Sequence, residues 1–181
     1  MELTAALPSH RDFLKMHGLG NDFIVVDGRS APFGPTPGLI RRLCDRHRGV
    51  GGDHLLVIEP PSRPDAAARM RIYNIDGTEA ETCVNATRCV CWLLLKDSGE
   101  AELRLETLGG VIVARRADGN RIALQIDAPR RGWAEIPLSQ DADTDALDIA
   151  SGPLSRPVAL NLGNPHLVCF VPDRDAVDVP R

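Results

Sequence analysis

The chain has 181 residues, a formal net charge of -4, and 43% hydrophobic and 25% charged residues. This composition is that of an ordinary globular protein and excludes collagen-like, coiled-coil and disordered classes. A chain of this length buries roughly 70% of its unfolded surface, so it needs no metal or disulfide to hold a core. The 21 basic residues are interspersed with 25 acidic ones. We therefore expect no nucleic-acid binding through a general electrostatic footprint.

The apolar segments and the start of the chain bear on its location. The longest strongly apolar run, Val90 to Leu95, is too short to span a bilayer. The first residues lack a basic stretch followed by a long apolar one, so we expect no secretory signal and a cytoplasmic, reducing location. An odd number of cysteines in that location does not predict a disulfide framework. Each of the five is then a core residue, a metal ligand or a reactive thiol: Cys44, Cys83, Cys89, Cys91 and Cys169.

The first part of the chain is predicted to alternate strands and turns. Residues 13–27 are typical of a short strand, a glycine-rich turn and a second, strong strand. Apolar positions at helical spacing predict a helix over residues 38–49, ended by Gly49. Strands are predicted over residues 54–60 and 70–77, the latter closing in a tight turn.

One segment of the chain is predicted to form a buried helix. Residues 84–96 leave almost no polar face, which indicates a helix surrounded by other elements. Alternating strands with a hairpin signal at residues 118–120 follow it, and residues 129–157 are predicted to cross to another unit. A final strand, turn and strand are predicted over residues 157–171. Many strands around one buried helix favour an α+β fold with a strongly curved sheet.

Cys83 is the cysteine that we expect to be reactive. It precedes the buried helix, where unpaired N–H groups and the positive end of the helix dipole favour a thiolate. Cys89 and Cys91 lie inside the helix, where a charged sulfur is costly. The alternative for Cys83 is a small buried hydrophobic residue, which is the commoner role of a free cysteine. The three cysteines form C-x5-C-x-C, which matches no common zinc spacing, so no metal site is predicted.

Four asparagines occur at glycine-containing turns or strand ends. Asn21, Asn74, Asn85 and Asn164 each offer a neutral side chain that both donates and accepts hydrogen bonds, which suits a zwitterionic ligand. Asparagine is also a routine turn residue, and that reading stays open. His166 is a candidate base or orienting group for a reactive thiol, and its alternative is an ordinary histidine at a strand edge.

Four motifs, in order, resemble the diaminopimelate epimerase family. They are MHGLGNDF (16–23), RHRGVGGDHLLVIEP (46–60), MRIYNIDGTEAETCVNATRC (70–89) and NLGNPH (161–166). The similarity extends from about residue 13 to about residue 172, and four separate matches make it far more specific than any single motif.

The resemblance implies a fold and an activity. The family fold has two pseudo-symmetric lobes, each a curved, mostly antiparallel sheet around a central helix. We expect residues 1–128 to form the first lobe and residues 129–181 to begin the second. Such enzymes interconvert LL- and meso-diaminopimelate in lysine and peptidoglycan precursor synthesis, with no cofactor and a small-molecule substrate between the lobes. One cysteine thiolate removes the α-proton, and a thiol of the other lobe delivers a proton to the opposite face. The resemblance leaves a homodimer open.

The resemblance also implies roles for individual residues. Cys83 matches the first-lobe catalytic cysteine, and His166 matches the histidine that supports the thiol chemistry. Two positions at the implied substrate site depart from the family pattern. His54 replaces a glutamine that contacts substrate, and Val84 replaces the glycine of Cys-Gly-Asn. The residues that match substrate-contacting positions are Asn21, His54, Asn74, Val84, Asn85 and Asn164.

The family's second catalytic cysteine has no counterpart in the 181 residues. The Glu-Arg pair and the CGxG-type loop of the second lobe are missing, and we place Cys169 inside an apolar strand, where it is no substitute. We therefore expect this chain, as a fragment, a truncated product or a degenerate copy, not to complete a two-base epimerisation. The alternatives are a non-catalytic homologue and another isomerase of the same fold, either proline racemase-like or phenazine-biosynthesis-like.

Overall fold

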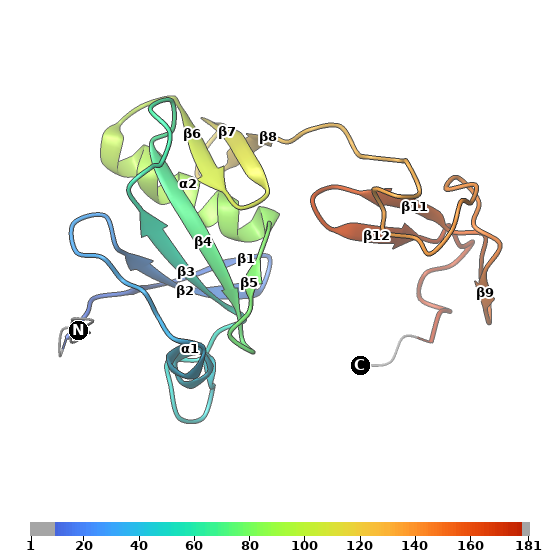
Figure 1. Ribbon diagram of the computed structural model, residues 1–181, viewed down its shortest axis with the longest axis horizontal. Helices are drawn as coiled ribbons and strands as arrows, with labels where there is room; N and C mark the ends of the chain where they lie inside the picture. Colours follow the sequence, from blue (N-terminus) through green and yellow to red (C-terminus); the bar gives the residue numbers. More distant parts are fainter. Residues whose placement is uncertain (1–9, 179–181) are drawn as a thin grey trace. The chain divides into compact units, whose positions relative to one another are not determined.

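The computed structural model describes residues 10–178, and in it the chain divides into two compact units (Figure 1). The first unit extends to Gln125 and the second begins at Ile126. The lobe boundary that we expect after residue 128 stays a prediction.

The first unit is built on one curved, mixed sheet. Neighbouring strands are antiparallel except for two parallel pairs, β2 with β3 and β4 with β6. The predicted α+β class, with a mostly antiparallel sheet, is confirmed. In spatial order the strands are β1 (Leu14–Gly18), β2 (Asn21–Asp27), β3 (His54–Glu59), β4 (Ala68–Asn74), β6 (Glu102–Thr107), β7 (Gly110–Arg116) and β8 (Ile122–Gln125), with the short β5 (Glu79–Ala80) beside β4.

Helix α2 (Val84–Ser98) fills the concave side of this sheet (Figure 1). It contacts β1, β2, β4, β6, β7 and β8, and fully buried side chains such as Val90 and Leu95 pack against the sheet's inner face. Gly99 ends the helix in the left-handed conformation with φ 76°, which a glycine adopts without strain. The buried helix predicted over residues 84–96 is thus confirmed, because a helix that is apolar nearly all round needs neighbours on every side.

Helix α1 (Pro37–Cys44) packs on the opposite face of the sheet, over β2 and β3. Thr36 caps its N-terminus by accepting a hydrogen bond from the Leu39 N–H, and Ile40 and Cys44 pack against that face. The prediction that Gly49 ends this helix was wrong. The helix stops at Asp45, whose carboxylate accepts the next backbone N–H groups and folds the chain into a turn.

The second unit has a small core and two hairpins. Its core consists of Ile136, Leu147 and Ala159. The predicted final strand, turn and strand are confirmed as β11 (Val158–Asn161) and β12 (Pro165–Val168). Cys169 lies after β12 and not inside a strand, which corrects our prediction. The hairpin of β9 (Ala150–Ser151) and β10 (Leu154–Ser155), like β5, was not predicted, because strands of two residues carry no alternation of polarity.

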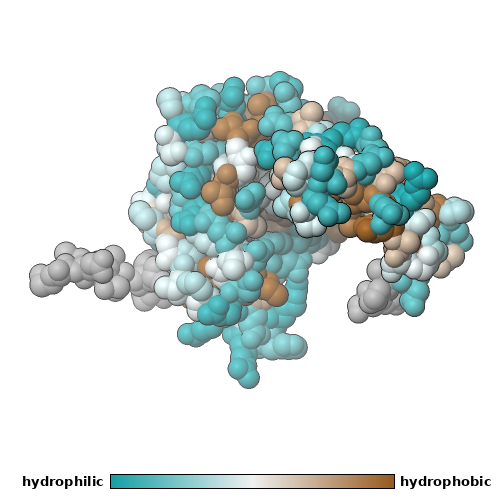
Figure 2. Space-filling view, turned by 45° about the vertical axis from the view of Figure 1, so that its right-hand side comes forward, coloured by the Kyte–Doolittle hydropathy of each residue, from teal (hydrophilic) through white to brown (hydrophobic). Residues whose placement is uncertain are grey.

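The surface in the view of Figure 2 is mainly hydrophilic, with hydrophobic residues in separate groups. Among the described residues, no helix has the length and apolar character needed to cross a membrane.

Candidate active site

Cys83 lies at the N-cap of α2. Its backbone is extended, with φ -150° and ψ 105°, and its carbonyl oxygen accepts hydrogen bonds from the N–H and Oγ1 of Thr87 at 2.9 and 3.0 Å. In the described part of the chain, the half-buried side chain of Cys83 makes no capping bond to the first helical turn. The N–H groups of that turn are therefore not occupied by the cap residue.

Two glycines let other elements approach the start of α2 closely. A Cβ atom on Gly18 of β1 would lie 3.2 Å from the Asn85 Cβ, and one on Gly109 would lie 3.2 Å from the Glu81 oxygen. The Gly109 N–H also donates to that oxygen at 3.0 Å, which fixes the segment before Cys83. The positions of both glycines thus place the β1–β2 hairpin and the β6–β7 turn against the helix start.

The β1–β2 hairpin places Asn21 beside Cys83. The hairpin loop is Leu19-Gly20, and both residues have positive φ, as in the tight turns that match strand twist. Asn21 is the first residue of β2, and its Oδ1 accepts a hydrogen bond from the Cys83 Sγ at 3.6 Å. The structure thereby brings together two of the predicted site residues.

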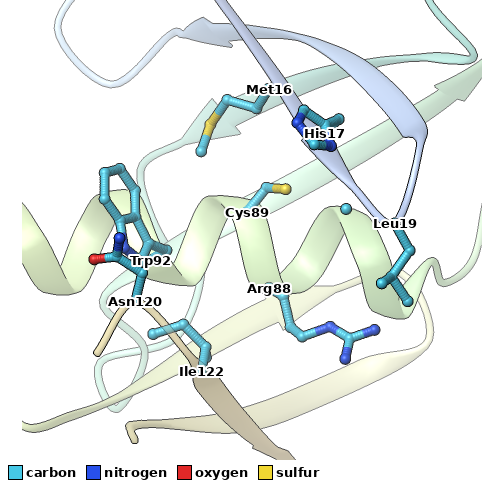
Figure 3. A pocket seen from close by; sticks show the side chains of 9 residues that line it. Met16, His17, Leu19, Arg88, Cys89, Trp92, Asn120 and Ile122 are labelled. Carbon is cyan, nitrogen blue, oxygen red and sulfur yellow. The ribbon is translucent and has the colours of Figure 1, made fainter. Parts of the chain in front are cut away.

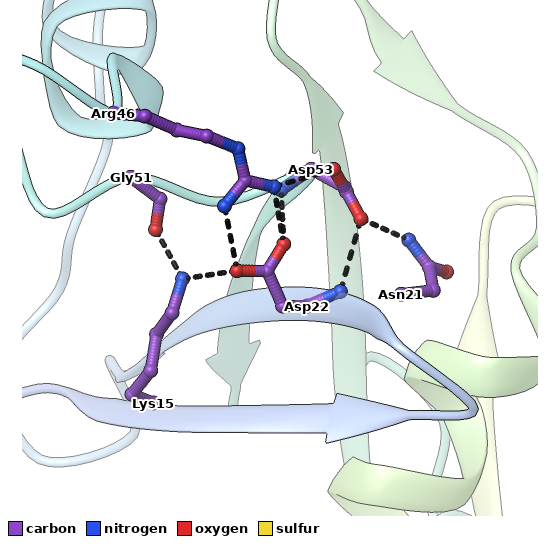
Figure 4. A network of polar contacts seen from close by, with 6 residues as sticks. All are labelled: Lys15, Asn21, Asp22, Arg46, Gly51 and Asp53. Atoms are coloured by element: carbon purple, nitrogen blue, oxygen red, sulfur yellow. Dashed lines mark hydrogen bonds and ion pairs between the residues drawn. The ribbon is translucent and has the colours of Figure 1, made fainter. Parts of the chain in front are cut away.

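A charged network lies behind Asn21 (Figure 4). The Asn21 Nδ2 donates to the Asp53 Oδ2 at 2.9 Å, and Arg46 Nη2 joins the carboxylates of Asp22 and Asp53 at 2.7 and 2.8 Å. Lys15 makes a further ion pair with Asp22 at 2.8 Å. The Arg46 and Lys15 side chains lower the pKa of Asp22, and the Asn21 amide lowers that of Asp53.

Sequence analysis missed the two carboxylates and the arginine of this network. Asp22 and Asp53 each end a glycine-rich turn, and that repeated glycine-to-aspartate pattern is the signal that could have indicated them.

Three of the predicted substrate-contacting residues lie at the same end of three neighbouring strands. His54 pairs with Phe23 on β2 and with Asn74 on β4, so the start of β3 and the end of β4 adjoin the start of β2. Asn21 lies at that same strand end, two positions before Phe23. The strand register therefore gathers side chains that are between 20 and 53 positions apart in the sequence.

His54 and Asn74 differ in how their side chains are satisfied. The Asn74 Nδ2 donates to the Thr78 Oγ1 at 3.0 Å. The Nδ1 atom of His54 is buried and has no hydrogen-bond partner among the described residues. Burial lowers the pKa of His54, because a charged imidazole loses hydration there.

Val84 and Asn85 form the first turn of α2. The Asn85 Oδ1 accepts a hydrogen bond from the Arg88 Nη2 at 2.7 Å, and the side chain of Val84 is exposed. The valine therefore lies at the surface of the helix start and not in the core.

His166 and Asn164 belong to the second unit. Asn164 lies in the turn that joins β11 to β12, where Gly163 has φ 101°, and His166 is the second residue of β12. The His166 Nε2 is 2.9 Å from the Asn164 Oδ1. The structure therefore pairs these two predicted residues with each other. The support of Cys83 by His166 stays a prediction.

The other helix cysteines are in a different environment from Cys83. Burial raises the pKa of Cys89, and it raises that of Cys91 to about 12. Cys89 lines a hollow of about 410 Å³ beside α2. Figure 3 shows its side chain between His17 of β1 and Ile122 of β8. None of the predicted site residues lines this hollow. Within residues 10–178, no group of three or more His, Cys, Asp or Glu is placed to hold a metal ion.

Comparison with known proteins supports the family suggested by the sequence motifs. The family model described as diaminopimelate epimerase matches residues 13–131. This chain belongs to the diaminopimelate epimerase family. The predicted resemblance is thus confirmed.

Curated members of the diaminopimelate epimerase family match most of the chain. The diaminopimelate epimerase of Rhizorhabdus wittichii is 49% identical over 170 residues, which are 93% of this chain and 59% of that protein. The diaminopimelate epimerase of Phenylobacterium zucineum is 45% identical over 169 residues, 91% of this chain and 60% of that protein. The chain therefore spans about three fifths of the length of these family members.

Solved structures share the fold at low sequence identity. A hydroxyproline epimerase from Agrobacterium vitis, solved with bound trans-4-hydroxy-L-proline, matches 87% of this chain and 50% of its own, with a TM-score of 0.59 and 19% identity. A phenazine biosynthesis protein of the PhzF family from Bacillus anthracis matches 91% of this chain and 56% of its own, with a TM-score of 0.55 and 20% identity. At this identity the likeness shows the fold alone, and it confirms the predicted fold class.

Proposed function

We propose that Cys83 is an acid–base residue of a cofactor-independent epimerase that inverts an α-carbon of diaminopimelate. The observation that carries the proposal is the position of its thiol, half-buried at the N-terminus of a buried helix and in contact with an asparagine side chain. The reaction would interconvert LL- and meso-diaminopimelate in the cytoplasm, on the route to lysine and peptidoglycan precursors. A homodimer is part of the same proposal.

The surroundings of Cys83 suit the removal of an α-proton. Such a proton is weakly acidic, and the negative charge that develops on its removal needs hydrogen-bond donors near the substrate carboxylate. The N–H groups of the first turn of α2 are donors of that kind, and the helix dipole favours an anion there. The amide groups of Asn21 and Asn85 lie at the same end of the helix and add neutral donors and acceptors.

The choice of Cys83 rests on its contrast with the neighbouring cysteines. A thiolate is the form that acts as a base, and burial disfavours it at Cys89 and Cys91. Inversion also needs a second acid–base group on the opposite face of the substrate. Exchange of the α-proton with solvent needs only the first, so it tests Cys83 by itself.

The test is exchange of the α-proton of diaminopimelate in deuterium oxide. We expect the 181-residue chain to incorporate deuterium at the α-carbon and Cys83→Ala to lose this exchange by about 100-fold or more, since a positioned acid–base group contributes about 10²- to 10⁴-fold. Cys169→Ala, the matched control at the other half-buried cysteine, keeps the parent rate. Equal exchange by the parent and Cys83→Ala would contradict the proposed role.

A further inference from the structure

The amide of Asn21 lies between a carboxylate and a thiol. Its Nδ2 is 2.9 Å from the Asp53 Oδ2, and its Oδ1 is 3.6 Å from the Cys83 Sγ (Figure 4 shows the Asp53 side of the amide). A carboxylate accepts hydrogen bonds and has none to donate, so the end of the amide that faces Asp53 has to be the NH₂ group. The end that remains for Cys83 is the oxygen.

Asp53 is itself held in place from three directions. Its Oδ2 also accepts from the Asp22 N–H at 3.0 Å, and its Oδ1 accepts from the Arg46 Nη2 at 2.8 Å. Its own N–H donates to the Asp22 carbonyl oxygen at 2.8 Å. These bonds join the carboxylate to the backbone of β2, the strand that carries Asn21, so the acceptor and the amide move together.

We propose that Asp53 is a positioning residue, which fixes the amide of Asn21 so that its oxygen faces Cys83 and holds this cysteine as an S–H donor. An oxygen acceptor favours the thiol, whereas an N–H group pointing at the sulfur would favour the thiolate. Cys83 then rests as a thiol, and it has to lose this proton before it can act as the base proposed above. The inference rests on the proposed function only where it gives the Cys83 thiol a part in the reaction. The geometry itself concerns the side chains of Asp53, Asn21 and Cys83 and involves no ligand.

The experiment measures how fast iodoacetamide alkylates Cys83 at pH 7.5, with each cysteine peptide quantified by mass spectrometry. Only the thiolate reacts, so the rate reports its fraction. In Asp53→Ala the amide is free to turn its NH₂ group to the sulfur, and the rate rises about tenfold, as expected for a hydrogen bond to a charged group. Cys169 in the same chain serves as the internal reference, and its rate does not change.

Two matched variants distinguish a change in the orientation of the Asn21 amide from the loss of the Asp53 charge or of the surrounding ion pairs. Asp53→Asn keeps an oxygen that can accept from Asn21 and from the Asp22 N–H, so its rate stays within about twofold of the parent. Arg46→Gln breaks the ion pairs of the network and leaves the bond between Asp53 and Asn21, so it too stays within about twofold. An increase in either variant equal to that in Asp53→Ala would overturn the inference, as would an unchanged or lower rate in Asp53→Ala.

If Asp53→Ala shows no cooperative unfolding on heating, it is not folded, and Asn21→Ala is used in its place. Removing an oxygen acceptor raises the alkylation rate of Cys83, and removing an N–H donor lowers it. A faster rate is expected, and a slower or equal rate would overturn the inference. The labelling experiment uses no substrate, so its outcome is independent of the deuterium-exchange test. Either the role of Asp53 or the role of Cys83 in exchange can therefore be contradicted while the other is supported.

Discussion

His54 shows how one departure from a family pattern is accommodated at the level of a residue. His54 begins β3 and is paired with Asn74 of β4, and its buried Nδ1 has no partner among the described residues. An unpaired buried nitrogen costs free energy, and a ligand with a donor or an acceptor at that point would recover it. We therefore propose that His54 contacts substrate, as the resemblance implies for the family glutamine.

The ionisation of His54 gives a prediction about stability and pH. Burial lowers its pKa, so the unfolded chain takes up a proton near the ordinary value of 6.5 while the folded chain does so only at lower pH. The unfolded state then binds more protons, and the free energy of unfolding falls as the pH drops below 6.5. We expect His54→Gln to lose less stability than the parent between pH 7 and pH 5 in urea unfolding. His47→Gln, at an exposed histidine, should follow the parent, and equal slopes for all three chains would contradict the prediction.

At the level of elements, the end of α1 is determined by how the following chain folds back. The N–H groups of Val50 and Gly51 both donate to the Leu43 carbonyl oxygen at 2.9 Å, so the last helical carbonyl groups are satisfied from the returning loop. Gly49 lies where this loop crosses the helix end. A Cβ atom there would lie 1.9 Å from the Arg42 carbonyl oxygen.

Gly49→Ala is therefore expected to destabilise the chain. The added methyl group meets backbone atoms that cannot rotate away, so the loop must shift, at a cost of about 1–3 kcal/mol. Gly34→Ala is the control, because nothing lies within 4 Å of a Cβ atom at that position. Chemical unfolding measures both variants, and a loss in Gly49→Ala no greater than that in Gly34→Ala would contradict this account.

The elements also show what the sequence could and could not predict. The spacing of apolar residues predicted α2 and the long strands, because in each element this spacing follows from which side chains are buried. Position at a helix start and next to glycine turns indicated Cys83 and Asn21. The bond between Asp53 and Asn21, by contrast, joins residues 32 positions apart, and it depends on the parallel register of β2 and β3. No local pattern contains that register, so the network behind the thiol emerged only from the structure.

At the level of the whole molecule, the two units differ in how much core they contain. The first unit buries the inner face of its sheet under α2 and the outer face of β2 and β3 under α1. The second buries three hydrophobic residues, Ile136, Leu147 and Ala159, under two short hairpins. Because burial of apolar surface is the main favourable term in folding, the two units should differ in local stability.

Hydrogen exchange of the native chain tests this difference. We expect the central amides of β3 and α2 to exchange only through global unfolding, since residues such as Leu56, Val90 and Leu95 are fully buried there and their hydrogen bonds are enclosed. The amides of β11 and β12 should exchange orders of magnitude faster, through local opening, because several side chains of that hairpin, including Leu167, are exposed. Mass spectrometry of peptides from each unit gives both rates in one sample. Equal protection of β11 and β3 would show that the second unit is stabilised by more than its own core.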